Sequence, residues 1–121
     1  MDIIYINELK VPANLGVYDW EKRLPQTIEI NLEFAVANQK AGATDSLADT
    51  IDYAKVTERI QTVLATHRFE LLEALAECIA NLLLHEFGAS WTKINVAKLG
   101  VLRNVKRVGI IIERARTDST V

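Results

Sequence analysis

The sequence contains little of what metal sites and disulfide frameworks require: its 121 residues include one cysteine and two histidines. Cys78 has no cysteine to pair with, and its apolar neighbours favour a small buried side chain over a nucleophile. His67 and His85 lie far apart in the sequence without another histidine or cysteine at ligand spacing, which argues against a zinc site. We therefore expect no bound metal and no cofactor.

Long apolar runs and clustered positive charge are also missing. No segment approaches the roughly 18 consecutive apolar residues of a membrane helix. The N-terminus, interrupted by Asn7, Glu8 and Lys10, lacks the basic start and apolar block of a secretory signal. The net charge is -2 and the lysines and arginines are scattered, unlike those of a nucleic-acid-binding protein. We expect a cytoplasmic protein with neither membrane nor nucleic-acid partners.

The length fits one domain, and no composition break divides the chain. We predict a single domain over residues 1–121, with a disordered polar tail over residues 116–121. Residues 27–36 alternate strictly between apolar and polar, which predicts a half-buried strand. Residues 3–11 are rich in β-branched side chains, and Asn14, Gly16 and Pro25 mark the connection between these strands. The two segments predict a hairpin with an elaborated loop.

Two helices and two further strands are expected after a small polar loop at residues 41–46. Asp52 can cap a helix that ends near His67, and a more buried helix should span about residues 70–87, stopped by Gly88. Strands are predicted at residues 91–98 and 108–113. This order favours an α+β fold in which both helices cover one face of an antiparallel four-stranded sheet. Ile111 and Trp91 would remain on the other face, which favours oligomerisation.

Three polar residues stand in notable positions. Lys98 continues the apolar parity of its strand, so it either bends away at the sheet rim or requires a partner for its desolvated ammonium. Glu73 lies in the first turns of a helix, where it suits the helix dipole or could accept two hydrogen bonds from an amino-pyrimidine ring. Tyr53 begins its helix and is either structural or a proton donor and acceptor.

Two short segments have similarly open interpretations. Residues 16–21 combine a glycine with Tyr18, Trp20 and two acids, and they either wall a ring-binding pocket or form a packed loop. Arg103, Lys106 and Arg107 form a basic cluster that is either a solvated loop or a phosphate contact.

Glu21, Tyr53, Glu73 and Lys98, in their sequence contexts, resemble the dihydroneopterin aldolase family. The resemblance runs over nearly the whole chain, through residues 1–4, 16–21, 52–53, 71–73, 98 and 108–114. It implies a tunnelling fold whose subunits join into tetrameric rings, two of which stack into an octamer. It also implies active sites between subunits, with Glu21, Tyr53 and Lys98 catalytic and with Glu73, Leu72 and Ile51 binding the pterin.

The family chemistry implied is a metal-free retro-aldol reaction. It splits 7,8-dihydroneopterin into 6-hydroxymethyl-7,8-dihydropterin and glycolaldehyde in folate biosynthesis. The N5=C6 imine of the reduced pterin is the electron sink, so neither a Schiff-base lysine nor zinc is needed. Re-addition of glycolaldehyde to the opposite face would epimerise C2′.

One departure from the family pattern leaves alternatives open. Many members have a proline after the catalytic lysine, whereas Lys98 is followed by Leu99. The residues after Lys98 are similar to those of dihydroneopterin triphosphate 2′-epimerases, and the basic cluster could contact a triphosphate. Residues 18–21 favour the aldolase. A non-catalytic pterin-binding ring protein is a third reading, against which the joint presence of Glu21, Tyr53 and Lys98 counts.

Overall fold

The structure is a computed structural model that describes residues 1–22 and 24–117. Of the tail predicted to be disordered, residues 118–121 lie outside the described residues. The elements in chain order are β1 (Asp2–Leu15), η1 (Asp19–Lys22), β2 (Gln26–Val36), α1 (Ala41–Thr44), η2 (Leu47–Asp49), α2 (Tyr53–Thr66), β3 (Arg68–Phe69), α3 (Leu72–Asn81), the π-helical η3 (Leu82–Glu86), β4 (Trp91–Leu102) and β5 (Val105–Ala115).

In the described part of the chain, five strands, rather than the predicted four, form one mixed sheet in the order β3-β1-β2-β4-β5. The four long strands pair antiparallel as expected. The fifth, β3, is two residues long and pairs parallel with the end of β1 through Asn14 and Leu15. A strand this short has no alternation pattern, so it could not be predicted from the sequence. Its pairing holds the chain that leaves α2 against the end of β1.

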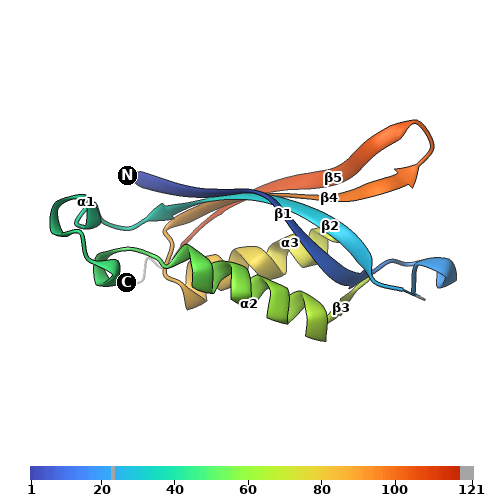
Figure 1. Cartoon of the computed structure of the whole chain (residues 1–121), viewed down its shortest axis with the longest axis horizontal. Helices are drawn as coiled ribbons and strands as arrows, with labels where there is room; N and C mark the ends of the chain where they lie inside the picture. Colours follow the sequence, from blue (N-terminus) through green and yellow to red (C-terminus); the bar gives the residue numbers. More distant parts are fainter. Residues whose placement is uncertain (23, 118–121) are drawn as a thin grey trace.

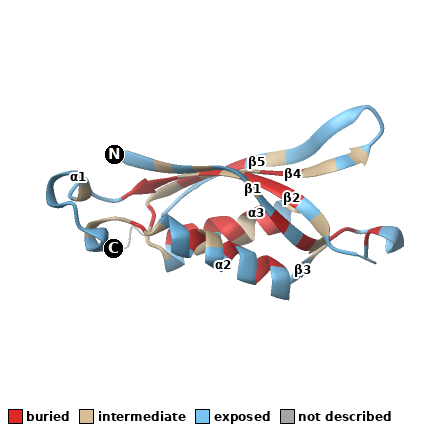
Figure 2. Ribbon diagram, viewed as in Figure 1, coloured by how far each residue is buried: buried red, intermediate tan, exposed pale blue. Residues whose placement is uncertain are grey.

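Helices α2 and α3 pack on one face of the sheet (Figure 1). The alternation of β2 and the helical stripes place their apolar side chains between the two layers, where the buried residues concentrate (Figure 2). The largest fully buried side chains include Ile28, Ile30, Leu32 and Phe34 of β2, Ile60 and Leu64 of α2, and Leu75, Ile79 and Leu83 of α3 and η3. The α+β class is therefore confirmed.

A bulge in β1 explains how apolar side chains from both halves of this 14-residue strand face the core. The register with β2 shifts between Ile6 and Leu9, where Glu8 has a φ of 57° and donates its N–H to Asn31 Oδ1 at 2.8 Å. The extra residue reverses the inward parity. Ile4 and Ile6 therefore pack toward the core before the bulge, and Leu9, Val11, Ala13 and Leu15 do so after it.

The predicted helix boundaries are close to the observed ones. Asp52 caps α2 by accepting hydrogen bonds from the N–H groups of Ala54 and Lys55, at 3.0 and 3.4 Å. The second helix begins at Leu72 and continues through the π-helical turn before Gly88, whose φ is 76°. The predicted loop at residues 41–46 contains the short helix α1. None of the helices in the described ranges is long and apolar enough to cross a bilayer.

The last two strands are longer than predicted, and their hairpin extends past the helices with much of its surface exposed (Figure 2). The sheet face opposite the helices carries exposed apolar side chains, as expected. Ile3, Tyr5 and Ile111 are 44%, 67% and 58% exposed, and Trp91 is half-buried. Exposed apolar side chains gathered on one sheet face favour contact with another chain.

Candidate active site

Lys98 lies on the inner face of the sheet, at the end of the apolar row of β4. It pairs in register with Ile28 of β2 and Val108 of β5. Its side chain is only 17% exposed, so it does not bend away into solvent at the rim. A desolvated ammonium requires a partner. The structure supplies one from a distant part of the chain.

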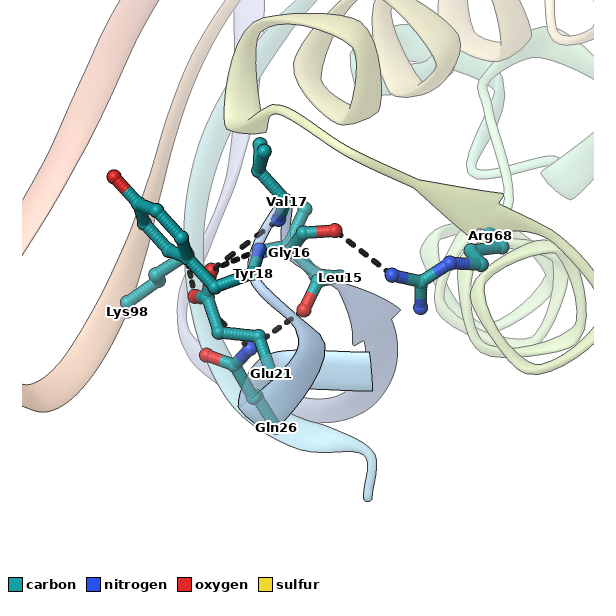
Figure 3. Close-up of polar contacts among 8 residues, drawn as sticks. All are labelled: Leu15, Gly16, Val17, Tyr18, Glu21, Gln26, Arg68 and Lys98. Atoms are coloured by element: carbon teal, nitrogen blue, oxygen red, sulfur yellow. Dashed lines mark hydrogen bonds and ion pairs between the residues drawn. The ribbon is translucent and has the colours of Figure 1, made fainter. Parts of the chain in front are cut away.

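That partner is Glu21, which lies against Lys98 in Figure 3. The Glu21 side chain is 5% exposed. Lys98 Nζ donates to Glu21 Oε2 at 2.7 Å. The other carboxylate oxygen accepts the backbone N–H groups of Val17 and Tyr18 at 3.2 and 3.4 Å. The hydrogen bond from Lys98 lowers the pKa of Glu21 below its ordinary value, although burial opposes the shift. Glu21 is therefore a buried carboxylate held ionised by its cationic neighbour.

Gly16 allows the loop to bring Glu21 to this position. Its φ is 139°, and a Cβ there would lie 2.3 Å from the Glu21 Cβ. No larger residue fits without displacing Glu21. The Gly16 N–H donates to Phe69 O at 3.0 Å, and Arg68 Nη2 donates to Gly16 O at 2.8 Å (Figure 3). The strand β3 thus anchors the loop that carries the carboxylate.

Sequence reasoning missed Gln26, which lies beside the pair (Figure 3). Its Nε2 donates to Leu15 O at 2.6 Å and approaches Glu21 Oε2 at 3.4 Å. A signal for it exists, because position 26 has the inward parity of Ile28 on β2. Like Lys98, it is a polar residue on the inward parity of a strand.

The ion pair opens into a cavity of about 430 Å³. Glu73 and Leu72, from the first turn of α3, line it together with Glu21 and Lys98. Its remaining walls are Val17, Tyr18, Trp20, Glu70, Leu71, Val101, Leu102 and Val108. The Tyr18 and Trp20 rings are stacked with centroids 6.1 Å apart. Apolar walls with a few charged groups are typical of small-molecule sites.

Tyr53 and Ile51 do not reach this cavity within one chain. They line a separate cavity of about 320 Å³ at the start of α2, where Tyr53 is 64% exposed and Ile51 is buried. The helix of 14 residues that follows spans roughly 20 Å before it reaches β3 and the Gly16 loop. One chain therefore assembles four of the six predicted site residues and holds the other two about one helix length away.

The remaining chemical candidates lie elsewhere. Arg107 pairs with the buried Glu29 at 2.7 Å, and Glu29 alternates with the inward-facing Ile28 and Ile30, so this pair is on the sheet face away from the helices. Burial raises the pKa of the Cys78 thiol, which makes it a poor nucleophile. Residues 1–22 and 24–117 contain no group of three or more histidine, cysteine, aspartate or glutamate side chains placed to hold a metal ion.

Comparison with known proteins gives one consistent result. The sequence model of the FolB dihydroneopterin aldolase family matches residues 4–113. The Escherichia coli K12 dihydroneopterin aldolase is 40% identical over 114 residues, covering 94% of this chain and 93% of the relative. The Haemophilus influenzae enzyme is 33% identical, covering 94% and 97%. The crystal structure of the E. coli enzyme in complex with neopterin superposes with a TM-score of 0.89 at 39% identity, covering 95% and 100%.

The lowered pKa of Glu21 predicts a pH-dependent stability. The pair stabilises the folded chain fully above the ordinary carboxyl value of 4.5, and this contribution is lost as the pH falls through the lower pKa of the folded state. The difference in unfolding free energy between the parent and Glu21→Gln should therefore be constant above that value and shrink below it. Denaturant titrations across this range measure it. In the Lys98→Met background, a pH dependence as large as in the parent would contradict the assignment.

Proposed function

The chain belongs to the dihydroneopterin aldolase family and acts as a lyase of folate synthesis, and we propose that the Lys98–Glu21 ion pair is its reaction centre. The observation that carries the proposal is the 2.7 Å contact between an ammonium and a buried carboxylate at the wall of an apolar cavity. The contact joins residues far apart in the sequence. The cytoplasmic location expected from the sequence is part of the proposal.

Glu73 anchors the pterin in this proposal. It is exposed in the first turn of α3 and lines the cavity, so its carboxylate can accept two parallel hydrogen bonds from the amino-pyrimidine edge. The backbone of Leu72 lies beside it, and Tyr18 and Trp20 provide flat apolar walls for a bicyclic ring. The neopterin complex of the E. coli relative supports a pterin as the ligand.

The reaction that fits these groups is a retro-aldol cleavage of 7,8-dihydroneopterin. The 2′-hydroxyl loses its proton, the C1′–C2′ bond breaks, and the electron pair moves through C6 to N5, which gains a proton. Lys98, oriented by Glu21, moves that proton through water. Glycolaldehyde leaves, and an enamine remains. Tyr53 then helps to protonate C1′ while N5 loses its proton, which gives 6-hydroxymethyl-7,8-dihydropterin.

Two subunits supply each site, because Tyr53 and Ile51 lie about one helix length from Lys98 in their own chain. Both sheet edges favour assembly. Among residues 1–22 and 24–117, β5 has a neighbouring strand on one side only, and at the other edge β3 pairs with just two residues of β1. We infer edge-to-edge rings of the tunnelling type, stacked as an octamer, in which the exposed Tyr53 of one chain faces the cavity of the next.

Two narrower activities follow from the same centre. If glycolaldehyde re-adds to the opposite face before it leaves, C2′ is epimerised, so an epimerase side activity is part of the proposal. A triphosphate substrate is less well supported, because Arg107 is paired with Glu29 on the sheet face away from the cavity. Non-catalytic pterin binding would not require the buried Lys98–Glu21 pair, so the pair favours catalysis over binding alone.

Substituting Lys98 and Glu73 separately should give opposite kinetic patterns, because the two residues have different proposed roles. Lys98→Ala should lower kcat by roughly 10²- to 10⁴-fold with little change in pterin affinity, since it removes a proton-transfer group. Glu73→Ala should mainly raise KM, by roughly 10- to 100-fold, since it removes charge-assisted hydrogen bonds to the ring. Steady-state kinetics and neopterin binding measure both. Lys93→Ala and Glu58→Ala are the matched controls, and the reverse pattern would overturn the roles.

Mixed assemblies test whether the site is shared. Tyr53→Phe and Lys98→Ala should each have low activity alone, because every site in such an assembly lacks one group. Co-expressed chains should recover activity, since some sites then combine an intact Tyr53 from one chain with an intact Lys98 from the other. Turnover per purified mixed assembly is the measurement. If the mixture is no more active than its components, the two residues belong to one chain's site.

Product analysis separates the possible activities. Purified protein incubated with 7,8-dihydroneopterin and a chelator should release glycolaldehyde and 6-hydroxymethyl-7,8-dihydropterin at the rate seen without chelator. A minor fraction of C2′ epimer should accumulate before the substrate is consumed. Turnover of the triphosphate should be slower than turnover of dihydroneopterin. Faster triphosphate epimerisation, or binding without glycolaldehyde release, would replace the proposal with the corresponding alternative.

A further inference from the structure

Gln26 occupies an inward-facing strand position, where an apolar side chain would be expected. It is the first residue of β2, pairs with Ala13 of β1, and shares the inward parity of Ile28. Ile28 in turn pairs with Lys98. The side chain therefore projects toward the same end of the inner sheet face as Lys98, next to the loop that carries Glu21 (Figure 3).

The hydrogen bonds of Gln26 fix its orientation. Nε2 faces two acceptors, Leu15 O at 2.6 Å and Glu21 Oε2 at 3.4 Å. A flipped amide would place an oxygen against both acceptors and is excluded. Its Oε1 is buried and has no hydrogen-bond partner among the residues that the structure describes. A buried acceptor without a partner costs free energy. The favourable contribution of this side chain therefore comes from its N–H donors.

We propose that Gln26 is a positioning residue for the reaction, which holds Glu21 Oε2 in line with Lys98 Nζ. The inference rests on the proposed role of the Lys98–Glu21 pair. Lys98 is the strongest donor to Oε2, but it is also the group that exchanges a proton during turnover. A neutral amide does not titrate, so it keeps a donor on Oε2 throughout the cycle.

The geometry explains why a second donor matters. Among the described residues, the other oxygen, Oε1, accepts the backbone N–H groups of Val17 and Tyr18 at 3.2 and 3.4 Å, hydrogen bonds about as long as the one that Gln26 donates to Oε2, so no contact apart from the one with Lys98 holds the carboxylate tightly. The strong bond from Gln26 to Leu15 O ties the amide to the end of β1, which is itself paired with β3. Gln26 therefore transmits the rigidity of the sheet to the carboxylate. Its hydrogen bond also contributes to the lowered pKa of Glu21.

Gln26→Met tests the proposal, because methionine has a similar volume and no N–H donor. We expect kcat to fall roughly tenfold or more, since a small misplacement of a reacting group is enough to slow proton transfer. KM and the dissociation constant of neopterin should change by less than about twofold, because Gln26 does not line the pterin cavity. Gln61→Met, an exposed glutamine on α2, is the matched control and should behave as the parent.

Two further variants, Gln26→Asn and Lys98→Met, make the experiment decisive. Gln26→Asn retains an amide that is too short to span both acceptors, so it should show the same split between kcat and KM, and its result stands if the methionine variant unfolds. Lys98→Met tests the pair itself. If Lys98→Met is inactive while both Gln26 variants keep the parental kcat, or if their loss is entirely in KM, the positioning role is wrong. If Lys98→Met remains active, the proposed reaction centre is wrong as well.

Discussion

The ion pair between Lys98 and Glu21 is the constraint around which this end of the molecule is organised. An ammonium on the inner face of a sheet is unfavourable unless a carboxylate is brought to it. The loop after β1 therefore has to turn sharply at Gly16, where a Cβ would collide with Glu21. The loop is held by the backbone of Phe69 and the guanidinium of Arg68. The shortest strand of the sheet thus supports the loop that carries Glu21.

The two glutamates at the cavity have environments that suit different tasks. Glu21 is buried and paired, so its charge is committed to Lys98 and its pKa is lowered. Glu73 is exposed at the start of α3, where the helix dipole favours an anion and a ligand can reach it. A buried paired acid suits proton movement, and an accessible acid suits ligand recognition. The roles proposed for Glu21 and Glu73 therefore agree with the difference in their burial.

The length of α2 accounts for the division of the predicted site residues between two cavities. Tyr53 begins the helix, and the β3 strand that supports the Glu21 loop follows its end, so one chain cannot place Tyr53 beside Lys98. The same chain leaves the apolar Ile3, Tyr5 and Ile111 exposed on the other sheet face. The proposed assembly would cover this face, extend the sheet edges and bring Tyr53 of one chain to the cavity of another.

Local patterns in the sequence were sufficient for the α+β class, the main strands, the Asp52 cap and the anomaly at Lys98, because alternation and capping depend on neighbouring residues. Only the tertiary structure revealed the two-residue strand β3 and the reversal of parity at the β1 bulge. The family resemblance had grouped Glu21 with Lys98, and the structure showed that the two pair within one chain. Gln26 lies between these cases, since its inward parity was visible but its partners were not. Pairings between distant segments depend on how the whole chain packs, and no local period encodes them.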